Sequence, residues 1–149
     1  LSRAGELVKA AAAEQLPSAH PDNPGIHTVN QTLWAGPLVR ENGVLTSRNG
    51  VIVSPGRLDR SPCGTGTTAR LALLHARGDI GEGERFVHES IIGTKFAGEI
   101  LATGTTGGLP SVEVSITGRA WITGFKQYVL DPSDPFPEGY TLTDTWPKG

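Results

Sequence analysis

The spacing of apolar residues changes along the chain, and each spacing predicts a different element. In residues 1–16, apolar side chains recur every three or four positions, which predicts a helix with one buried stripe that ends at Pro17. The positions of this stripe are Leu1, Ala4, Val8, Ala11, Ala12 and Leu16. Residues 26–35 are predicted to form a strand, and the apolar run at 51–53 predicts a short buried strand.

The middle of the chain is predicted to contain a hairpin-like region and a second helix. Residues 41–50 contain two Asn-Gly pairs, which favour tight hairpin turns. A helix is predicted from Thr67 to Arg77, where Gly78 suits the position just after a helix end. This helix follows the loop SPGRLDRSPCG, which separates it from the strand at 51–53.

From Phe86 onward the pattern becomes that of β-structure. Turns of Gly, Thr and Pro separate four strand-like segments, FVHESII, KFAGEILAT, PSVEVSIT and AWITGFKQYVL. The tail is rich in proline and acidic residues and is predicted to be irregular. The chain therefore reads as an α+β fold of about two helices and six or seven strands, with mostly antiparallel pairing in its second half.

Composition narrows the class of protein. The 149 residues are 37% hydrophobic, which is enough for one domain with a core. The net charge is −2 with both signs mixed, so no basic surface for nucleic acid or membrane is expected.

No apolar run reaches the roughly 18 residues of a membrane span, and no signal peptide opens the chain. One cysteine cannot form an internal disulfide, so a cytoplasmic location is expected. The start at Leu1 and the absence of methionine indicate a piece of a longer protein.

The single cysteine, Cys63, lies in a polar loop directly before the predicted helix. A lone cysteine is most often a buried packing residue. A thiol at a helix N-terminus, however, meets the positive end of the helix dipole, which favours the thiolate form. Cys63 can therefore be interpreted either as a packing residue or as a reactive thiol.

A nucleotide-binding loop is a third interpretation of this segment. Residues 64–69 match the G-x-G-x-x-A pattern, and Glu84 follows about twenty residues later. In a dinucleotide-binding fold the first glycine directly follows a strand. Here a loop separates Val53 from Gly64, and no lysine follows Gly66 as in a Walker A loop. The context therefore argues against nucleotide binding.

The same glycines can instead form an anion site. Gly64, Thr65 and Gly66 can direct several backbone N–H groups toward one point, and the helix N-terminus adds further donors. Such a turn suits a carboxylate. Asp59, four residues before Cys63, could hold a cationic amine. Carboxylate donors, an acid for an ammonium group and a thiol between them predict an amino-acid site in which Cys63 faces the substrate Cα.

The stretch DRSPCGTGTTARLA resembles the second cysteine motif of the proline racemase family, which includes hydroxyproline 2-epimerases. EQLPSAHPDNPG, FVHESIIGTKFAGEI and ITGFKQYVLDPSDPFPEGY are similar to segments of that family in the same order. The resemblance covers essentially the whole chain. It implies an isomerase of amino-acid metabolism that uses no cofactor.

The resemblance also implies a fold and a domain organisation. Enzymes of this family are similar to diaminopimelate epimerase, with two pseudo-symmetric halves and an active site in the cleft between them. Residues 1–149 would be the C-terminal half, a mixed and mostly antiparallel sheet or barrel around a central helix at 67–77. Residues 1–16 would link the halves, and residues 129–149 would form an irregular tail that could dock on the missing N-terminal half.

Roles for individual residues follow from the resemblance. Cys63 would be one acid/base of a two-cysteine racemisation or epimerisation at Cα of proline or 4-hydroxyproline. Gly64 and Thr65 would contact the substrate carboxylate, and Asp59 the ring amine. The opposing group must come from the missing half, so this chain alone is expected to be an incomplete enzyme. Two copies could also form a homodimer with their Cys63 side chains face to face.

Two alternatives stay open. Related dehydratases of 3-hydroxyproline typically carry threonine at the position of Cys63, so the cysteine argues against that activity without excluding it. The other alternative is a non-catalytic module that binds an amino acid. Proline racemases tend to carry an aromatic residue where this chain has Val53, and the smaller side chain leaves room for a ring hydroxyl, which favours 4-hydroxyproline.

The histidines give weaker evidence of a functional role than the cysteine motif does. His88 could lie near the cleft, although a strand histidine more commonly has a hydrogen-bonded structural role. His20, His27 and His75 have no cysteine or carboxylate at metal-ligand spacing, so no metal site is predicted.

Overall fold

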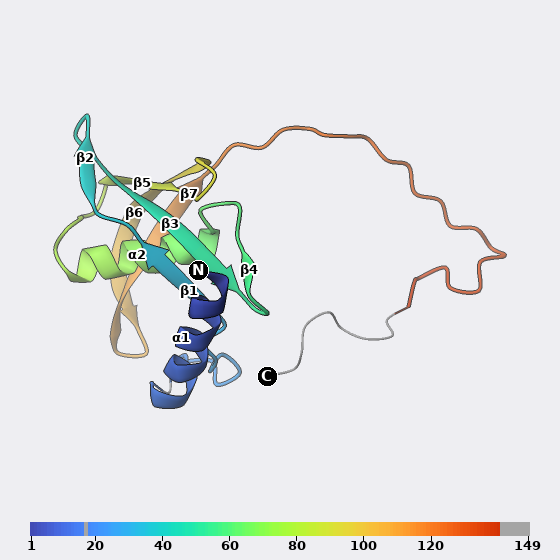
Figure 1. Cartoon of the computed structure of the whole chain (residues 1–149), viewed down its shortest axis with the longest axis horizontal. Coiled ribbons are helices and arrows are strands. Elements are labelled where there is room, and N and C mark those ends of the chain that lie inside the picture. The colour runs from blue at the N-terminus through green and yellow to red at the C-terminus, as the bar shows by residue number, and fades with distance from the viewer. Residues whose placement is uncertain (17, 141–149) are drawn as a thin grey trace. The chain divides into compact units, whose positions relative to one another are not determined.

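The computed structural model describes residues 1–16 and 18–140, and the chain divides into two units, Leu1–Arg119 and Ala120–Gly149. Every described helix and strand belongs to the first unit (Figure 1). In chain order they are α1 (Ser2–Gln15), β1 (Gln31–Ala35), β2 (Val39–Glu41), β3 (Val44–Val53), β4 (Arg57–Leu58), α2 (Gly64–Ala76), β5 (Arg85–Glu89), β6 (Lys95–Thr106) and β7 (Leu109–Thr117). The α+β prediction is confirmed.

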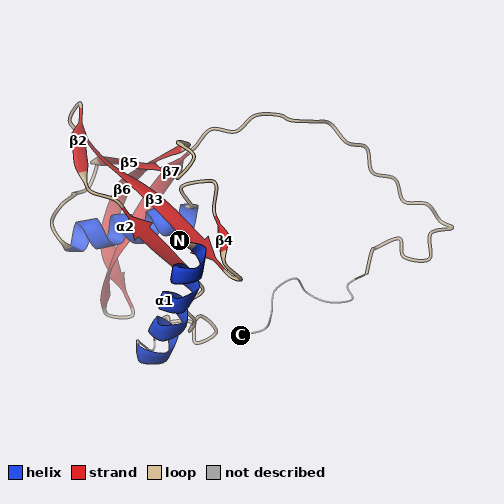
Figure 2. Ribbon diagram, in the orientation of Figure 1, coloured by secondary structure: helices blue, strands red, loops and turns tan. Residues whose placement is uncertain are grey.

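The strands form one mixed sheet (Figure 2). Its order is β1-β3-β5-β6-β7, and β2 and β4 also pair with β3. Strands β3 and β5 are parallel, whereas the other pairs are antiparallel, as predicted for most of them. Among the described strands no pairing joins β1 to β7, so the sheet is not closed into a barrel.

Only the first of the two turns predicted within residues 41–50 is present. Asn42 and Gly43 have φ values of 51° and 82°, so the first Asn-Gly pair does form the turn between β2 and β3. The second pair, Asn49 and Gly50, lies inside β3 opposite β1, and its predicted turn is wrong. Pairing with β1 overrides the local turn preference, because it provides the backbone of β3 with ladder hydrogen bonds.

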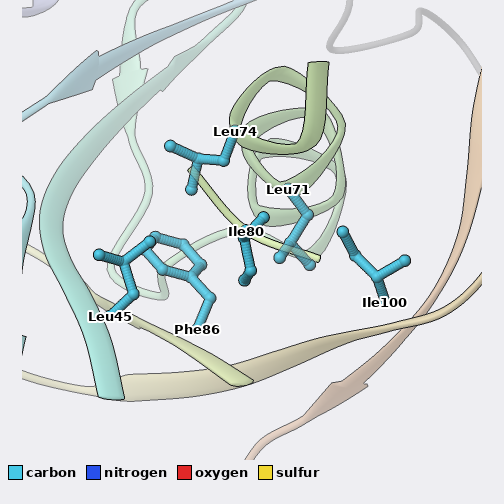
Figure 3. Packing of buried hydrophobic residues seen from close by; sticks show 6 residues of the cluster. All are labelled: Leu45, Leu71, Leu74, Ile80, Phe86 and Ile100. Carbon is cyan, nitrogen blue, oxygen red and sulfur yellow. The ribbon is translucent and has the colours of Figure 1, made fainter. Parts of the chain in front are cut away.

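Helix α2 packs against β6 and β7 and covers the main hydrophobic core. Figure 3 shows the buried side chains of this core, Leu45, Leu71, Leu74, Ile80, Phe86 and Ile100. The helix comes very close to the sheet at Gly98, where a Cβ atom would lie 2.6 Å from Leu71 Cδ1. A glycine in β6 therefore sets the depth at which α2 sits, and this holds the N-terminus of α2 in place.

Helix α1 does not bury the predicted stripe. Leu1, Val8 and Leu16 are 60%, 49% and 68% exposed. The helix instead contacts β1 and β3, and its one buried residue is Gly5, where a Cβ would be 2.6 Å from Ile52 Cγ1. The stripe prediction is wrong because a glycine, and not an apolar row, provides the close contact. The helix ends at Gln15, and Pro17 lies outside the described residues.

Residues 120–140 of the second unit contain no described helix or strand, so the predicted strand AWITGFKQYVL is wrong. An extended segment becomes a strand only when a neighbour accepts its backbone hydrogen bonds, and none of the described strands pairs with it. Local turns organise it instead. The Asp131 carboxylate accepts bonds from the N–H and Oγ of Ser133, at 2.9 and 2.7 Å, which lower its pKa. Residues 141–149 of the predicted tail lie outside the described residues.

Candidate functional site

Cys63 occupies the cap position of α2. Its Sγ accepts a hydrogen bond from the N–H of Gly66 at 3.3 Å, and its carbonyl accepts the N–H of Thr67 at 2.9 Å. The thiol in turn donates to Gln31 Oε1 at 3.5 Å. The side chain is 7% exposed. The sulfur therefore has a donor on one side and an acceptor on the other, which suits a group that must both hold and release a proton.

The loop before Cys63 is held by its own polar side chains. Asp59 Oδ1 accepts the N–H of Ser61 at 2.8 Å, and Ser61 Oγ accepts the N–H of Cys63 at 3.0 Å. Asp59 N–H donates to the carbonyl of Val51 at 2.9 Å, which fixes the start of the loop against β3. The sequence D-x-S-x-C thus forms two consecutive side-chain turns that lead to the helix.

A second turn supports this loop from outside. Thr94 Oγ1 donates to the carbonyl of Arg60 at 3.2 Å and lies 2.7 Å from Ser90 Oγ. Ser90 and Thr94 belong to the loop between β5 and β6. This contact joins two segments that are distant in the sequence.

The predicted substrate-contact residues lie along the cysteine loop, where Asp59 and Thr65 line two different hollows and Gly64 lines neither of them. Asp59 and Val53 line a cavity of about 290 Å³ together with Arg57, Leu58 and Arg60. Thr65 lines a groove of about 450 Å³ that runs between the β1 region and α2, and Gln31 and Gly66 also line it. Gly64 and Thr65 are exposed at the end of α2, whereas Asp59 is half-buried. The structure thus places Asp59, Cys63, Gly64 and Thr65 on one loop and helix end, with Asp59 and Thr65 at separate hollows and Cys63 in the lining of neither.

Gly66 is where α2 approaches the sheet most closely near Cys63. A Cβ at this position would lie 2.9 Å from Leu33 Cδ1, 3.2 Å from Val51 Cγ2 and 3.4 Å from Cys63 Cβ. Gly64 differs, since a Cβ there would meet no described atom within 4 Å. The two glycines of the motif therefore have different roles: Gly66 permits packing, and Gly64 leaves the helix end open.

His88 is a fully buried member of β5, and its hydrogen-bonded role agrees with the more common interpretation of a strand histidine. Its Nδ1 lies 3.0 Å from Thr67 Oγ1 and 3.3 Å from Asn49 Nδ2. Burial, and to a smaller extent the charge of Arg70, lowers the pKa of His88 from 6.5 to about 4. The imidazole is therefore neutral at physiological pH.

Sequence reasoning missed Gln31, Asn49 and Thr67 as neighbours of Cys63. Asn49 lies in the polar run TSRNG of β3, so its burial, and with it the need of its amide for partners, is seen only in the fold. Gln31 and Thr67 likewise carry no signal, since strand pairing and the placement of α2 bring them to the cysteine.

Within the described ranges, no group of three His, Cys, Asp or Glu residues could hold a metal ion. Over the same ranges, neither helix has the length and apolar character needed to cross a bilayer.

Comparison with known proteins gives a consistent result. Residues 1–141 match the family model described as proline racemase. A probable proline racemase from Agrobacterium radiobacter K84, solved with bound carbonate, is 39% identical over 97% of this chain with a TM-score of 0.75. A hydroxyproline epimerase from Agrobacterium vitis, solved with bound trans-4-hydroxy-L-proline, is 38% identical over 97% of this chain, also with a TM-score of 0.75. The chain covers only 42% and 41% of those two proteins.

Proposed function

The chain belongs to the proline racemase family, and on that premise we propose that it is the C-terminal half of a cofactor-independent amino-acid racemase or epimerase. The observation that carries the proposal is the position of Cys63, whose sulfur accepts from Gly66 N–H and donates to Gln31 Oε1. In the proposed reaction Cys63 is one of two acid/base groups, and the second comes from the N-terminal half.

Inversion at Cα needs a base on one face of the substrate and an acid on the other. In one direction the Cys63 thiolate takes the α-proton and becomes a thiol, while the C–H electron pair moves toward the substrate carboxylate. The opposing acid then delivers a proton to the other face of Cα and becomes the base for the reverse reaction. Protons and charge balance, and no oxidant or reductant is needed.

The α2 N-terminus supports the role proposed for Gly64 and Thr65. The N–H groups of Gly66 and Thr67 are already bound within the cysteine turn, so the preceding donors at the exposed helix end are those of Gly64 and Thr65. A carboxylate placed there gains charge as Cα loses its proton, and fixed N–H donors stabilise that charge. These two residues are therefore the proposed carboxylate contacts.

Asp59 is the proposed partner of the substrate amine. One of its oxygens accepts the Ser61 N–H, which orients the carboxylate on the loop. Asp59 shares its hollow with Val53. The short side chain of Val53 leaves space beside the ring of the proposed substrate. This supports 4-hydroxyproline as the substrate in preference to proline.

The N-terminal half is the proposed partner of this chain, because a reaction that needs two opposed groups cannot be completed by one cysteine. The tail at 129–149 is the proposed docking segment, and residues 1–16 the proposed link between the halves. A homodimer of the isolated half with two opposed Cys63 side chains is an additional proposal; sedimentation of the isolated chain as a monomer at all concentrations would rule it out.

The test is proton NMR in D₂O on the full-length enzyme with trans-4-hydroxy-L-proline and, separately, L-proline. Loss of the α-proton signal and appearance of the epimer are expected, with faster exchange for the hydroxylated substrate. A signal that persists with both substrates would refute the racemase proposal and leave a dehydratase or a binding module. Formation of a dehydrated product would then indicate the dehydratase, and saturable binding without exchange would indicate the binding module.

A further inference from the structure

Three buried side chains from three elements form a cluster beside the carbonyl directly before Cys63. Asn49 Nδ2 of β3 donates to the Pro62 carbonyl at 2.7 Å, and Thr67 Oγ1 of α2 lies 3.4 Å from the same oxygen. His88 of β5 lies behind both, with its Nδ1 3.0 Å from Thr67 Oγ1 and 3.3 Å from Asn49 Nδ2. This buried cluster links the sheet and the helix to the peptide group that leads to Cys63.

The hydrogen bonds fix which nitrogen of His88 carries the proton. The Asn49 amide must direct its NH₂ group at the Pro62 carbonyl, because the alternative orientation would place two oxygens 2.7 Å apart. That NH₂ group also faces His88 Nδ1, so Nδ1 acts as the acceptor and Nε2 carries the hydrogen of the neutral ring. Thr67 Oγ1 can then donate to Nδ1 as well. His88 is therefore the common acceptor that orients both side chains.

The peptide before Cys63 needs such support. Cys63 has a φ of 65°, a left-handed conformation that residues with a Cβ avoid. A strained residue keeps such a conformation only when its surroundings determine it from several sides. If the Pro62 carbonyl were free to turn, Cys63 could relax to negative φ, and its sulfur would leave the Gly66 N–H and the end of α2.

We infer that His88 is a positioning residue for Cys63: it holds the Asn49 amide, which locks the Pro62 carbonyl, and thereby keeps the Cys63 sulfur at the N-terminus of α2. The inference rests on the proposed function only in assigning Cys63 a catalytic task; the geometric link stands without it. His88 touches neither substrate nor sulfur in this role, and it acts solely through the backbone of the loop.

The first test measures the reactivity of the Cys63 thiol in the full-length enzyme. Iodoacetamide alkylation is followed by mass spectrometry of the tryptic peptide from Ser61 to Arg70, which contains Cys63 as its only cysteine. His88→Leu removes the acceptor, whereas His88→Asn places an amide oxygen close to the position of Nδ1. We expect roughly tenfold slower alkylation in His88→Leu and a rate within about threefold of wild type in His88→Asn.

Ile100→Val is the matched control, because it removes a methyl group from the core of Figure 3 and not from the hydrogen-bonded cluster. It should leave the alkylation rate unchanged. A His88→Leu variant that matches Ile100→Val, or a His88→Asn variant as slow as His88→Leu, would overturn the inference. If His88→Leu does not fold, Asn49→Leu, which removes the donor to the Pro62 carbonyl, must show the same slowing.

The second test separates positioning from substrate binding. In the full-length enzyme, His88→Leu should lower kcat for epimerisation roughly 10- to 100-fold with KM within about threefold of wild type, and His88→Asn should recover most of kcat. An unchanged kcat in His88→Leu would contradict the inference. If wild type shows no exchange at Cα, the proposed function fails, while the alkylation comparison still decides the role of His88.

Discussion

The N–H of Gly66 donates to the Sγ of Cys63 at 3.3 Å, so the candidate acid/base is also the cap of the helix that follows it. The same atom therefore contributes to helix stability and, in the proposed reaction, to proton transfer. The two contributions can be separated experimentally, because a hydroxyl can replace a thiol as a cap and cannot readily replace it as a base at neutral pH.

Cys63→Ser and Cys63→Ala should affect stability and activity differently. Serine retains an acceptor for the Gly66 N–H, so its free energy of unfolding should stay within about 0.5 kcal/mol of wild type. Alanine removes the cap and should lose about 0.5–2 kcal/mol. Both variants of the full-length enzyme should exchange the substrate α-proton at least about 100-fold more slowly. Urea unfolding and NMR in D₂O measure the two effects, and near-normal exchange in Cys63→Ser would disprove the catalytic role.

Replacement of Gly64 and of Gly66 by alanine should affect the stability of the fold differently. At Gly66 a Cβ would lie 2.9 Å from Leu33 Cδ1, so Gly66→Ala should destabilise the fold by about 1–3 kcal/mol. At Gly64 a Cβ would meet no described atom within 4 Å, so Gly64→Ala should change stability by less than about 0.5 kcal/mol. Because its methyl group would stand where the substrate carboxylate is proposed, Gly64→Ala should raise KM. Equal stability losses in both variants would contradict this division of roles.

Local sequence patterns were sufficient for part of this fold. The Asn42-Gly43 turn and the helix before Gly78 follow from residues that need positive φ, and both are present at 51°, 82° and 76°. Patterns failed where tertiary pairing decides, as for Asn49-Gly50 inside β3 and for the segment from Ala120 onward, which lacks a partner among the described strands. A local pattern cannot show which distant strand will accept a backbone hydrogen bond.

The candidate site, like the fold, could be predicted from the sequence only where its residues are close together in the chain. The loop from Asp59 to Cys63 could be recognised because its chemistry is contiguous in the sequence. Gln31 and His88 reach that loop through β1 and β5, and their relation to Cys63 depends on strand order and on the depth of α2. Their roles therefore became visible only with the fold.

Two substitutions of Asp59 should separate the effect of its charge on substrate binding from its role in the structure of the loop. Asp59→Asn keeps an oxygen for the Ser61 N–H, now bound at 2.8 Å, and removes only the charge. Stability should be unchanged, and KM should rise roughly tenfold or more, because a charged partner of the substrate amine is lost. Asp59→Ala should raise KM similarly and also lose about 1 kcal/mol, since the turn loses its acceptor. If KM in Asp59→Asn stays at the wild-type value, the carboxylate serves the loop alone.

His88 should make the stability of the protein depend on pH. Its pKa is lowered to about 4 in the folded state, mainly by burial, whereas the unfolded chain has the ordinary value of 6.5. Between these values the unfolded state binds more protons, so the contribution of His88 to stability is complete above pH 6.5 and decreases as the pH falls toward 4. The total loss should be about 3 kcal/mol.

The comparison with His88→Asn isolates this effect from the other titrating groups. Asparagine keeps an acceptor for Thr67 and Asn49 and does not titrate, so it should lack the His88 part of the pH dependence. Urea unfolding between pH 4 and pH 7 should therefore show that the wild type loses more stability than His88→Asn as the pH falls. Parallel curves would mean that His88 takes up its proton equally well in the folded protein, which its complete burial argues against.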